Sequence, residues 1–173
     1  MSERVSVLSE EQIAEKIAIV AKQISEDYQG QELIVVAILK GAFIFCADLV
    51  RQLDLESVKI DFLRAASYGS GTTSSEEVKL IKDIDIDIMG KHVLIVEDIV
   101  DTGLTLSFLV EHMRLRSPKS VKICTMIDKK ERRKVDVKVD YACHTVSEGF
   151  LIGYGLDYAE DYRNLSGLYH LKQ

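Results

Sequence analysis

Apolar residues recur along the chain with two different periods, and the first to appear is helical. Between residues 9 and 29 they fall three or four positions apart, at Ile13, Ile17, Val20 and Ile24. This spacing gathers them on one face of an amphipathic helix. Ser9 and Gln12 can form a capping box at its start, and Gly30 is a natural stop after its end. The pattern therefore predicts a long helix over residues 9–29.

Continuous apolar runs predict buried strands further along. The clearest run is Leu33–Leu39, which suits a strand covered on both faces, as in a parallel sheet. A similar run occupies residues 93–96, and residues 121–126 are expected to form a further strand. Residues 58–62 alternate between apolar and charged side chains, which predicts a strand with one polar side.

Helical patterns over residues 42–50 and 102–116 separate these strands. Small polar residues fill the segment 65–77 and predict a mobile loop, whereas Val78, Leu80 and residues 84–88 indicate a hairpin or edge pairing. Alternating strands and helices predict a doubly wound α/β fold, a mostly parallel twisted sheet flanked by helices.

The pattern changes to short strands and Gly-rich turns after residue 135. We therefore expect one domain over residues 1–173, with a core at about 30–135. A small hood lobe is expected from about residues 1–10 and 136–173. A chain of this length normally forms one domain.

Composition narrows the function classes. The net charge is −6, which counts against a protein that binds nucleic acid over its whole surface. No apolar run is long enough to span a membrane, so we expect no membrane partner. The start lacks the apolar stretch of a signal peptide, and the three cysteines, Cys46, Cys124 and Cys143, form no C-x-x-C pair. These features predict a cytoplasmic protein without disulfides.

The segment Val93–Leu106 carries the candidate chemistry. A buried strand leads to three carboxylates, Glu97, Asp98 and Asp101, and a helix then begins at Thr102-Gly103-Leu104-Thr105. Ligands bind at the carboxyl ends of strands in open α/β sheets, and a helix N-terminus suits a phosphate. The carboxylates would then serve sugar hydroxyls or a bound cation. The plainer interpretation is a solvated acidic loop with a helix cap.

The run Glu-Asp-Ile-Val-Asp-Thr-Gly-Leu-Thr resembles the phosphoribosyl pyrophosphate (PRPP) motif of type I phosphoribosyltransferases, in particular their hypoxanthine/guanine group. The resemblance covers about residues 33–165 and implies the type I phosphoribosyltransferase fold. It implies that Glu97 and Asp98 hold the ribose hydroxyls, directly or through Mg²⁺. The 5′-phosphate would be bound by Asp101, Thr102, Gly103, Leu104 and Thr105. Asp101 would also act as general base or acid at purine N7.

The resemblance implies further ligands for the other parts of the substrates. Pyrophosphate would be bound by Lys40, Gly41, Ser67, Tyr68, Arg133 and Arg163, with a cis peptide bond before Lys40 and a lid headed by Ser67-Tyr68. The purine would be bound by Lys129, Phe150, Leu151 and Asp157. In this scheme Lys129 donates to the exocyclic O6, Phe150 stacks on the ring, and the Leu151 backbone reads the base edge. Mg²⁺ would be held by Glu97, Asp98 and Asp157.

The implied activity is purine salvage: a glycosyltransferase that makes IMP or GMP and pyrophosphate from PRPP and a 6-oxopurine. The implied assembly is a homodimer or homotetramer. Five of the six residues from Lys129 to Lys134 are basic, which alone indicates a solvated face or a local nucleic-acid patch. A PRPP-sensing RNA-binding regulator of the same fold is therefore one alternative. Another is a different base, such as xanthine or adenine.

Overall fold

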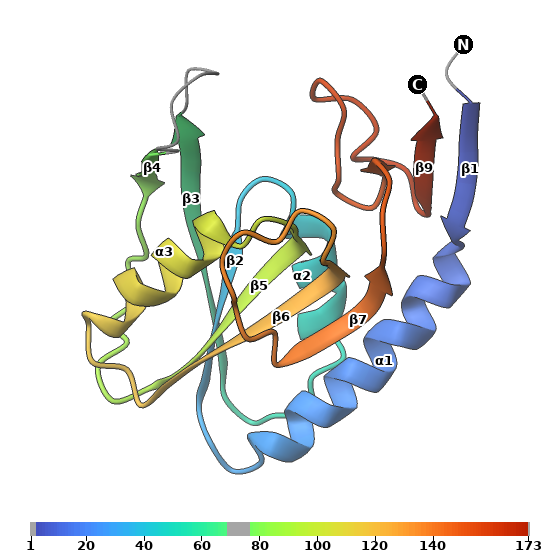
Figure 1. The fold of residues 1–173 in the computed structure, drawn as a ribbon. Helices are drawn as coiled ribbons and strands as arrows, with labels where there is room; N and C mark the ends of the chain where they lie inside the picture. Colours follow the sequence, from blue (N-terminus) through green and yellow to red (C-terminus); the bar gives the residue numbers. More distant parts are fainter. Residues whose placement is uncertain (1–2, 69–76, 173) are drawn as a thin grey trace.

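The computed structural model describes residues 3–68 and 77–172. Its centre is a six-stranded sheet with the order β4-β3-β2-β5-β6-β7 (Figure 1). The strands are β2 (Leu33–Ile38), β3 (Val58–Tyr68), β4 (Glu77–Lys82), β5 (His92–Val100), β6 (Ser120–Lys129) and β7 (Tyr141–Val146). All neighbours pair in parallel except β4, which runs antiparallel to β3. The predicted mostly parallel α/β fold is confirmed.

Helices cover both faces of this sheet because its central strands are apolar on both sides. Helices α1 (Glu10–Asp27) and α2 (Phe43–Val50) lie on one face, and α3 (Leu104–Arg114) lies on the other (Figure 1). Alternate residues of β2 divide between the two cores: Leu33, Val35 and Ala37 pack beneath α1 and α2, whereas Ile34, Val36 and Ile38 pack beneath α3.

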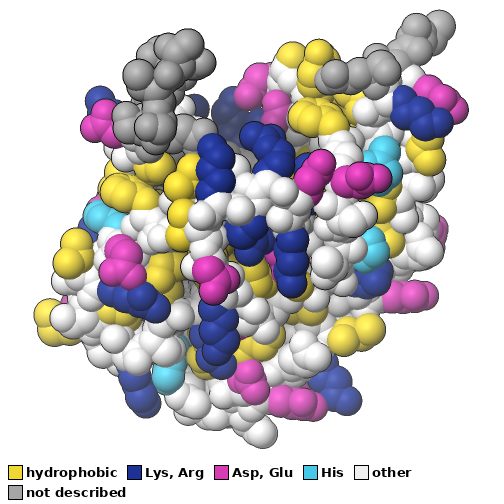
Figure 2. Space-filling model, viewed as in Figure 1, with side chains coloured by type: hydrophobic (Ala, Val, Ile, Leu, Met, Phe, Trp, Pro, Cys, Tyr) yellow, Lys and Arg dark blue, Asp and Glu magenta, His cyan; other side chains and the backbone are white. Residues whose placement is uncertain are grey.

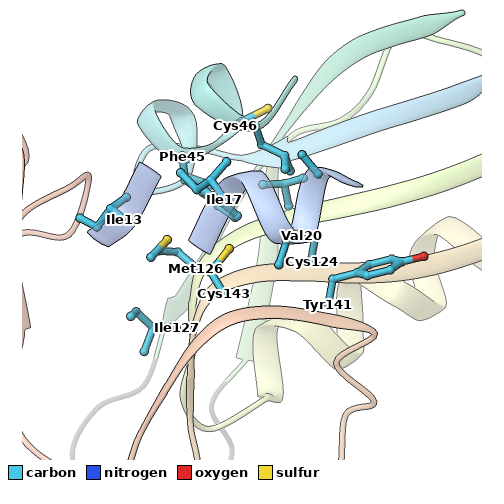
Figure 3. Packing of buried hydrophobic residues seen from close by; sticks show 14 of the residues in the cluster. Ile13, Ile17, Val20, Phe45, Cys46, Cys124, Met126, Ile127, Tyr141 and Cys143 are labelled. Atoms are coloured by element: carbon cyan, nitrogen blue, oxygen red, sulfur yellow. The ribbon is translucent and has the colours of Figure 1, made fainter. Parts of the chain in front are cut away.

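The predicted first helix is confirmed as α1. Ser9 accepts a hydrogen bond from the Gln12 backbone, and the Gln12 side chain accepts one from the Ser9 backbone, so the capping box is complete. Ile13, Ile17 and Val20 on its buried face pack against residues of α2, β6 and β7 (Figure 3). All three cysteines are free and lie in this core.

A second, three-stranded sheet stands above one end of the central sheet (Figure 1). It consists of β1 (Glu3–Leu8), β8 (Leu151–Ile152) and β9 (Leu168–Lys172) in the order β1-β9-β8. Antiparallel pairing of β1 with β9 brings the two ends of the chain together. The strand β7 belongs to the central sheet although it lies after residue 135, where we expected the core to end.

Two sequence expectations differ from the structure. Ser67 and Tyr68 belong to β3 and not to a loop, because their backbones pair with Val78 and Glu77 of β4. The remaining part of the predicted loop, residues 69–76, lies outside the described residues. The segment 84–88, in which Ile and Asp alternate, forms no strand, because the Asp61 carboxylate accepts the backbone N–H groups of residues 85 and 86 in place of a neighbouring strand. Among the described residues, no helix is long and apolar enough to cross a membrane.

Candidate active site

The strand order creates a crevice between β2 and β5. The chain passes from β2 to β3 on one side and later enters β5 on the other side, so the loops after β2 and β5 diverge. A cleft of about 340 Å³ opens at this point. Most of the residues predicted to bind PRPP line it: Gly41, Glu97, Asp98, Asp101, Thr102, Gly103, Thr105 and Arg163. Asp157, predicted to bind the purine and Mg²⁺, lines it as well.

Glu97 and Asp98 lie near the carboxyl end of β5, half-buried in the wall of the cleft. Burial and the neighbouring Asp98 carboxylate raise the pKa of Glu97 well above its usual range. Burial also raises the pKa of Asp98. Two adjacent carboxyl groups with raised pKa values favour a partner that neutralises them, such as a cation, or hydroxyl groups that donate to them. The acidic pair is therefore better explained as a binding site than as a solvated loop.

The loop after β2 lies directly against this acidic pair. The peptide bond between Leu39 and Lys40 is cis, as the resemblance implied. A side-chain carbon added at Gly41 would lie 1.9 Å from an Asp98 carboxylate oxygen, so any larger residue there would displace that carboxylate. A carbon added at Gly155 would lie 2.1 Å from the Gly41 carbonyl oxygen. Close backbone approach thus joins the loop after β2 to the segment that follows β8.

The N-terminus of α3 faces the same cleft. Gly103 is the N-cap residue, and its φ of 81° is in the left-handed region that favours glycine. A cap without a side chain leaves backbone N–H groups of the first helical turn available for an anion. The hydroxyls of Thr102 and Thr105 lie in the cleft lining beside them. Leu104 begins the helix, so its backbone belongs to this turn although its side chain has no polar atom.

Asp101 lies between the acidic pair and the helix. Its Oδ2 is 3.4 Å from Arg132 Nη1. Within the described part of the chain, its Oδ1 is buried and has no hydrogen-bond partner. An orphaned buried carboxylate oxygen is costly, which indicates that a ligand donates a proton or hydrogen bond to it.

A cluster of opposite charges closes another side of the cleft. Arg163 Nη2 lies 3.0 Å from Asp157 and 3.3 Å from Glu160, and its Nη1 donates to the Gly155 carbonyl. Lys40 Nζ donates to the other carboxylate oxygen of Glu160 at 2.5 Å. We did not single out Glu160 from the sequence, since no motif marks it and its partner Lys40 is far away along the chain.

The residues predicted to bind the purine lie on neighbouring elements. Lys129 ends β6, is only 7% exposed, and places Nζ 3.3 Å from Glu131. Phe150 is 45% exposed and meets Tyr158 edge to face. Leu151 is buried in β8. Because nearly half of the Phe150 side chain is exposed, its ring is accessible for stacking on a ligand.

Arg133 has a different environment from the one we predicted. Its guanidinium donates to the Val100, Asp101 and Lys129 carbonyls and to the Asp128 carboxylate, at 2.6–3.1 Å. These four acceptors lie within the protein, so Arg133 joins the ends of β5 and β6 through Nε and Nη2. The sequence did not indicate this role because the acceptors are mainly backbone groups brought together by folding. Its contact with pyrophosphate stays a prediction.

The fold and the cleft define an α/β protein with a cleft that suits a phosphorylated ligand at the carboxyl edge of its sheet. The model of the phosphoribosyl transferase domain matches residues 5–159. The chain belongs to this family.

Individual relatives agree with this assignment. The chain is 46% identical over 159 residues to a hypoxanthine-guanine phosphoribosyltransferase of Bacillus subtilis, covering 92% of this chain and 88% of that protein. It is 47% identical over 161 residues to a hypoxanthine phosphoribosyltransferase of Salmonella typhimurium, covering 92% and 90%. A crystal structure of a hypoxanthine-guanine phosphoribosyltransferase from Bacillus anthracis is similar, with a TM-score of 0.91 and 46% identity over 98% of this chain and 99% of that one.

Proposed function

We propose that this protein transfers the 5-phosphoribosyl group of PRPP to N9 of hypoxanthine or guanine, giving IMP or GMP and pyrophosphate. The observation that carries the proposal is the cleft between β2 and β5, where the acidic pair and the α3 N-terminus line one space. Membership of the phosphoribosyl transferase domain family and close relatives named for this activity support it. The role is purine salvage.

The PRPP ligands follow from the chemistry of the cleft. The backbone N–H groups of residues 102–105 and the hydroxyls of Thr102 and Thr105 bind the 5′-phosphate. Glu97 and Asp98 bind the ribose hydroxyls. Pyrophosphate is bound by the Gly41 backbone and by Lys40, Arg163, Ser67 and Tyr68. Support for Arg163 comes from its Nε, which is buried without a hydrogen-bond partner in the described residues.

Magnesium is the expected cofactor. Within the described ranges, no group of three or more side chains forms a preassembled metal cage. This suits Mg²⁺, which uses one or two carboxylates together with substrate phosphates and water. The partly buried carboxyl groups of Glu97 and Asp98, and Asp157 across the cleft, supply suitable oxygens. When bound, Mg²⁺ neutralises the charge of the phosphates.

The base is selected by Lys129, Phe150 and Leu151, with Asp157 beside them. Lys129 donates to O6, and an amino group at that position would leave two donors facing each other. As the N9–C1′ bond forms, the bond between C1′ and the pyrophosphate oxygen breaks. Asp101 takes the proton from N7, which its unpartnered Oδ1 supports. The anionic oxygens around the ribose stabilise the positive charge that develops on the sugar.

The alternative of a PRPP-sensing RNA-binding regulator has less support. Two of the five cations in the basic run are not available to RNA, because Lys129 is buried and Arg133 donates within the fold. The relatives described above are named as enzymes. We also propose a cytoplasmic location and a homodimer or homotetramer, which light scattering of the purified protein would distinguish.

One assay tests the proposed function. The protein is incubated with PRPP, Mg²⁺ and hypoxanthine, guanine, xanthine or adenine in turn, and the nucleotide is separated by chromatography. We expect IMP and GMP to form and AMP not to form. Absence of product with all three 6-oxopurines would refute the activity.

A further inference from the structure

We propose that the Glu160 carboxylate pairs with the cations of the pyrophosphate site when no pyrophosphate is bound. By competing for these cations, Glu160 sets the affinity of the site for pyrophosphate. The inference rests on the proposed function, because it concerns the cations assigned to pyrophosphate. One carboxylate reaches both of them: Oε2 accepts from Lys40 Nζ at 2.5 Å, and Oε1 lies 3.3 Å from Arg163 Nη2. A phosphate group that bridges a lysine and an arginine needs the same two contacts.

Glu160 is held in this position by its backbone. Its φ is 71°, and Ala159 and Tyr162 also have positive φ values of 52° and 77°. Non-glycine residues rarely adopt this conformation, and three of them lie within four positions. The Glu160 N–H donates to Asp157, and Tyr158 pairs with Asp161 across the turn. The turn therefore fixes the backbone position from which the Glu160 side chain reaches both cations.

The two cations are fixed relative to this turn by separate contacts. Arg163 Nη1 donates to the Gly155 carbonyl, and the Gly155 N–H donates to the Arg163 carbonyl. Gly155 in turn lies against the Gly41 backbone, which adjoins Lys40. Lys40 and Glu160 are exposed, with 48% and 65% of their side chains accessible. Their pair can therefore open without unfolding, and an arriving pyrophosphate can take both cations from Glu160.

Glu160 and pyrophosphate compete for the same two cations, and this competition affects the free energy of pyrophosphate binding. Pyrophosphate must break two ion pairs before it makes its own contacts, so the cost of breaking them subtracts from its affinity. Pairing with Lys40 lowers the pKa of Glu160, so the carboxylate is charged at neutral pH. Exposed pairs are individually weak, and losing two of them should tighten binding by about three- to tenfold. The same competition would speed release of pyrophosphate after the reaction.

Asp161 provides a matched control. It adjoins Glu160 and is exposed, and within the described part of the chain its side chain makes no ion pair. Glu160→Gln and Asp161→Asn remove the same charge one position apart. At about 0.15 M salt, charges more than about 8 Å apart are largely screened, so only loss of the direct pairs should distinguish the variants. Glu160→Gly is a second variant, because glycine accepts the positive φ at this position.

The experiment measures binding of magnesium pyrophosphate to the intact protein by calorimetry, and the KM values for pyrophosphate and IMP in the reverse reaction. We expect Glu160→Gln and Glu160→Gly to lower the dissociation constant and the KM for pyrophosphate about three- to tenfold. The KM for IMP and both constants of Asp161→Asn should stay near the wild-type values. Unchanged or weaker pyrophosphate binding by the Glu160 variants would overturn the inference about Glu160. If the wild-type protein still forms nucleotide, the proposed function is unaffected by that result. A wild-type protein that neither turns over nor binds pyrophosphate would overturn both.

Discussion

Asp101 is the residue whose geometry most directly indicates a chemical step. It lies in the cleft between the acidic pair and the α3 N-terminus, and its Oδ1 is buried without a partner in the described residues. A proton acceptor must be poised close to the proton that it takes, and such a group contributes about 10²- to 10⁴-fold to rate.

We predict that Asp101→Asn slows nucleotide formation by about 10²-fold or more while PRPP still binds, because the amide keeps the size of the side chain but cannot accept a proton as a base. Steady-state rates and calorimetric titration with PRPP measure the two effects separately. Asp54→Asn, an exposed change away from the cleft, is the control. A rate close to wild type would remove Asp101 from its proposed role.

Individual residues could be predicted from the sequence where a contiguous motif carries them. Glu97, Asp98 and residues 101–105 follow one strand and begin one helix, so local spacing already brings them together. The contacts of Glu160 and Arg133 could not be predicted in this way. The partner of Glu160 is Lys40, and Arg133 binds carbonyl groups of two other elements, so both roles exist only after the sheet has formed.

At the scale of elements, Arg133 joins the ends of two neighbouring strands. The Val100 carbonyl ends β5 and the Asp101 carbonyl follows it, and Asp128 and the Lys129 carbonyl end β6. One guanidinium therefore aligns the proposed general base with the proposed O6 donor. The N–H groups of residues 134 and 135 also donate to the Thr102 carbonyl, which holds the segment after β6 against the same turn.

We predict that Arg133→Gln lowers the free energy of unfolding by about 3–5 kcal/mol, because it removes the close partner of the buried Asp128 carboxylate and leaves it only the exposed Lys130, whose Nζ is 3.9 Å away. It should also lower kcat about 10- to 100-fold, since small displacements of catalytic groups are costly. Urea unfolding and steady-state kinetics measure these changes.

The Arg133→Lys variant tests whether the charge of Arg133 or the shape of its guanidinium is needed. Lysine keeps the charge but lacks the planar fork that reaches several acceptors, so it should recover part of the stability and little of kcat. Arg114→Lys, at an exposed pair with Glu111, is the control. Wild-type kcat in Arg133→Lys would contradict the proposed alignment.

Elements differ in how far the sequence defines them. Helix α1 begins where Ser9 and Gln12 predict, because a capping box and a 3.6-residue period are local properties. Strand ends are less local. Strand β3 extends to Tyr68 because β4 pairs with it, and residues 84–88 leave the sheet because Asp61 binds their backbone. Where a strand ends therefore depends on which hydrogen-bond partners its backbone has in the folded protein.

For the whole molecule, the net charge of −6 hides a separation of charges. Carboxylates line the crevice between β2 and β5, whereas Lys and Arg side chains gather near the middle of the face drawn in Figure 2 with acidic side chains beside them. Such an arrangement suits a ligand with both phosphates and hydroxyls better than a uniformly charged polymer. The sign of the net charge therefore says less about function than the positions of the charges do.

Ion pairs also join the strands at the opposite edge of the central sheet, where the parallel strands begin. Glu32 precedes β2 and lies 2.8 Å from Lys59 at the start of β3 and 2.7 Å from Lys91 just before β5. It thus ties together the beginnings of three adjacent parallel strands. Hydrogen bonds from Lys59 and Lys91 lower the pKa of Glu32 from 4.5 to about 2.

We predict that Glu32→Gln lowers the free energy of unfolding at pH 7 and that the difference from wild type shrinks as the pH falls from about 4.5 toward about 2. In that window the unfolded chain binds a proton at Glu32 while the folded chain does not, so the stabilisation is present above it and is lost as the pH falls through it. Urea unfolding at pH 7 and pH ~3 measures the difference. Glu56→Gln, a nearby exposed acid, should show little change at either pH. A difference for Glu32→Gln that is equally large at both pH values would mean that shape, and not charge, joins the three strands.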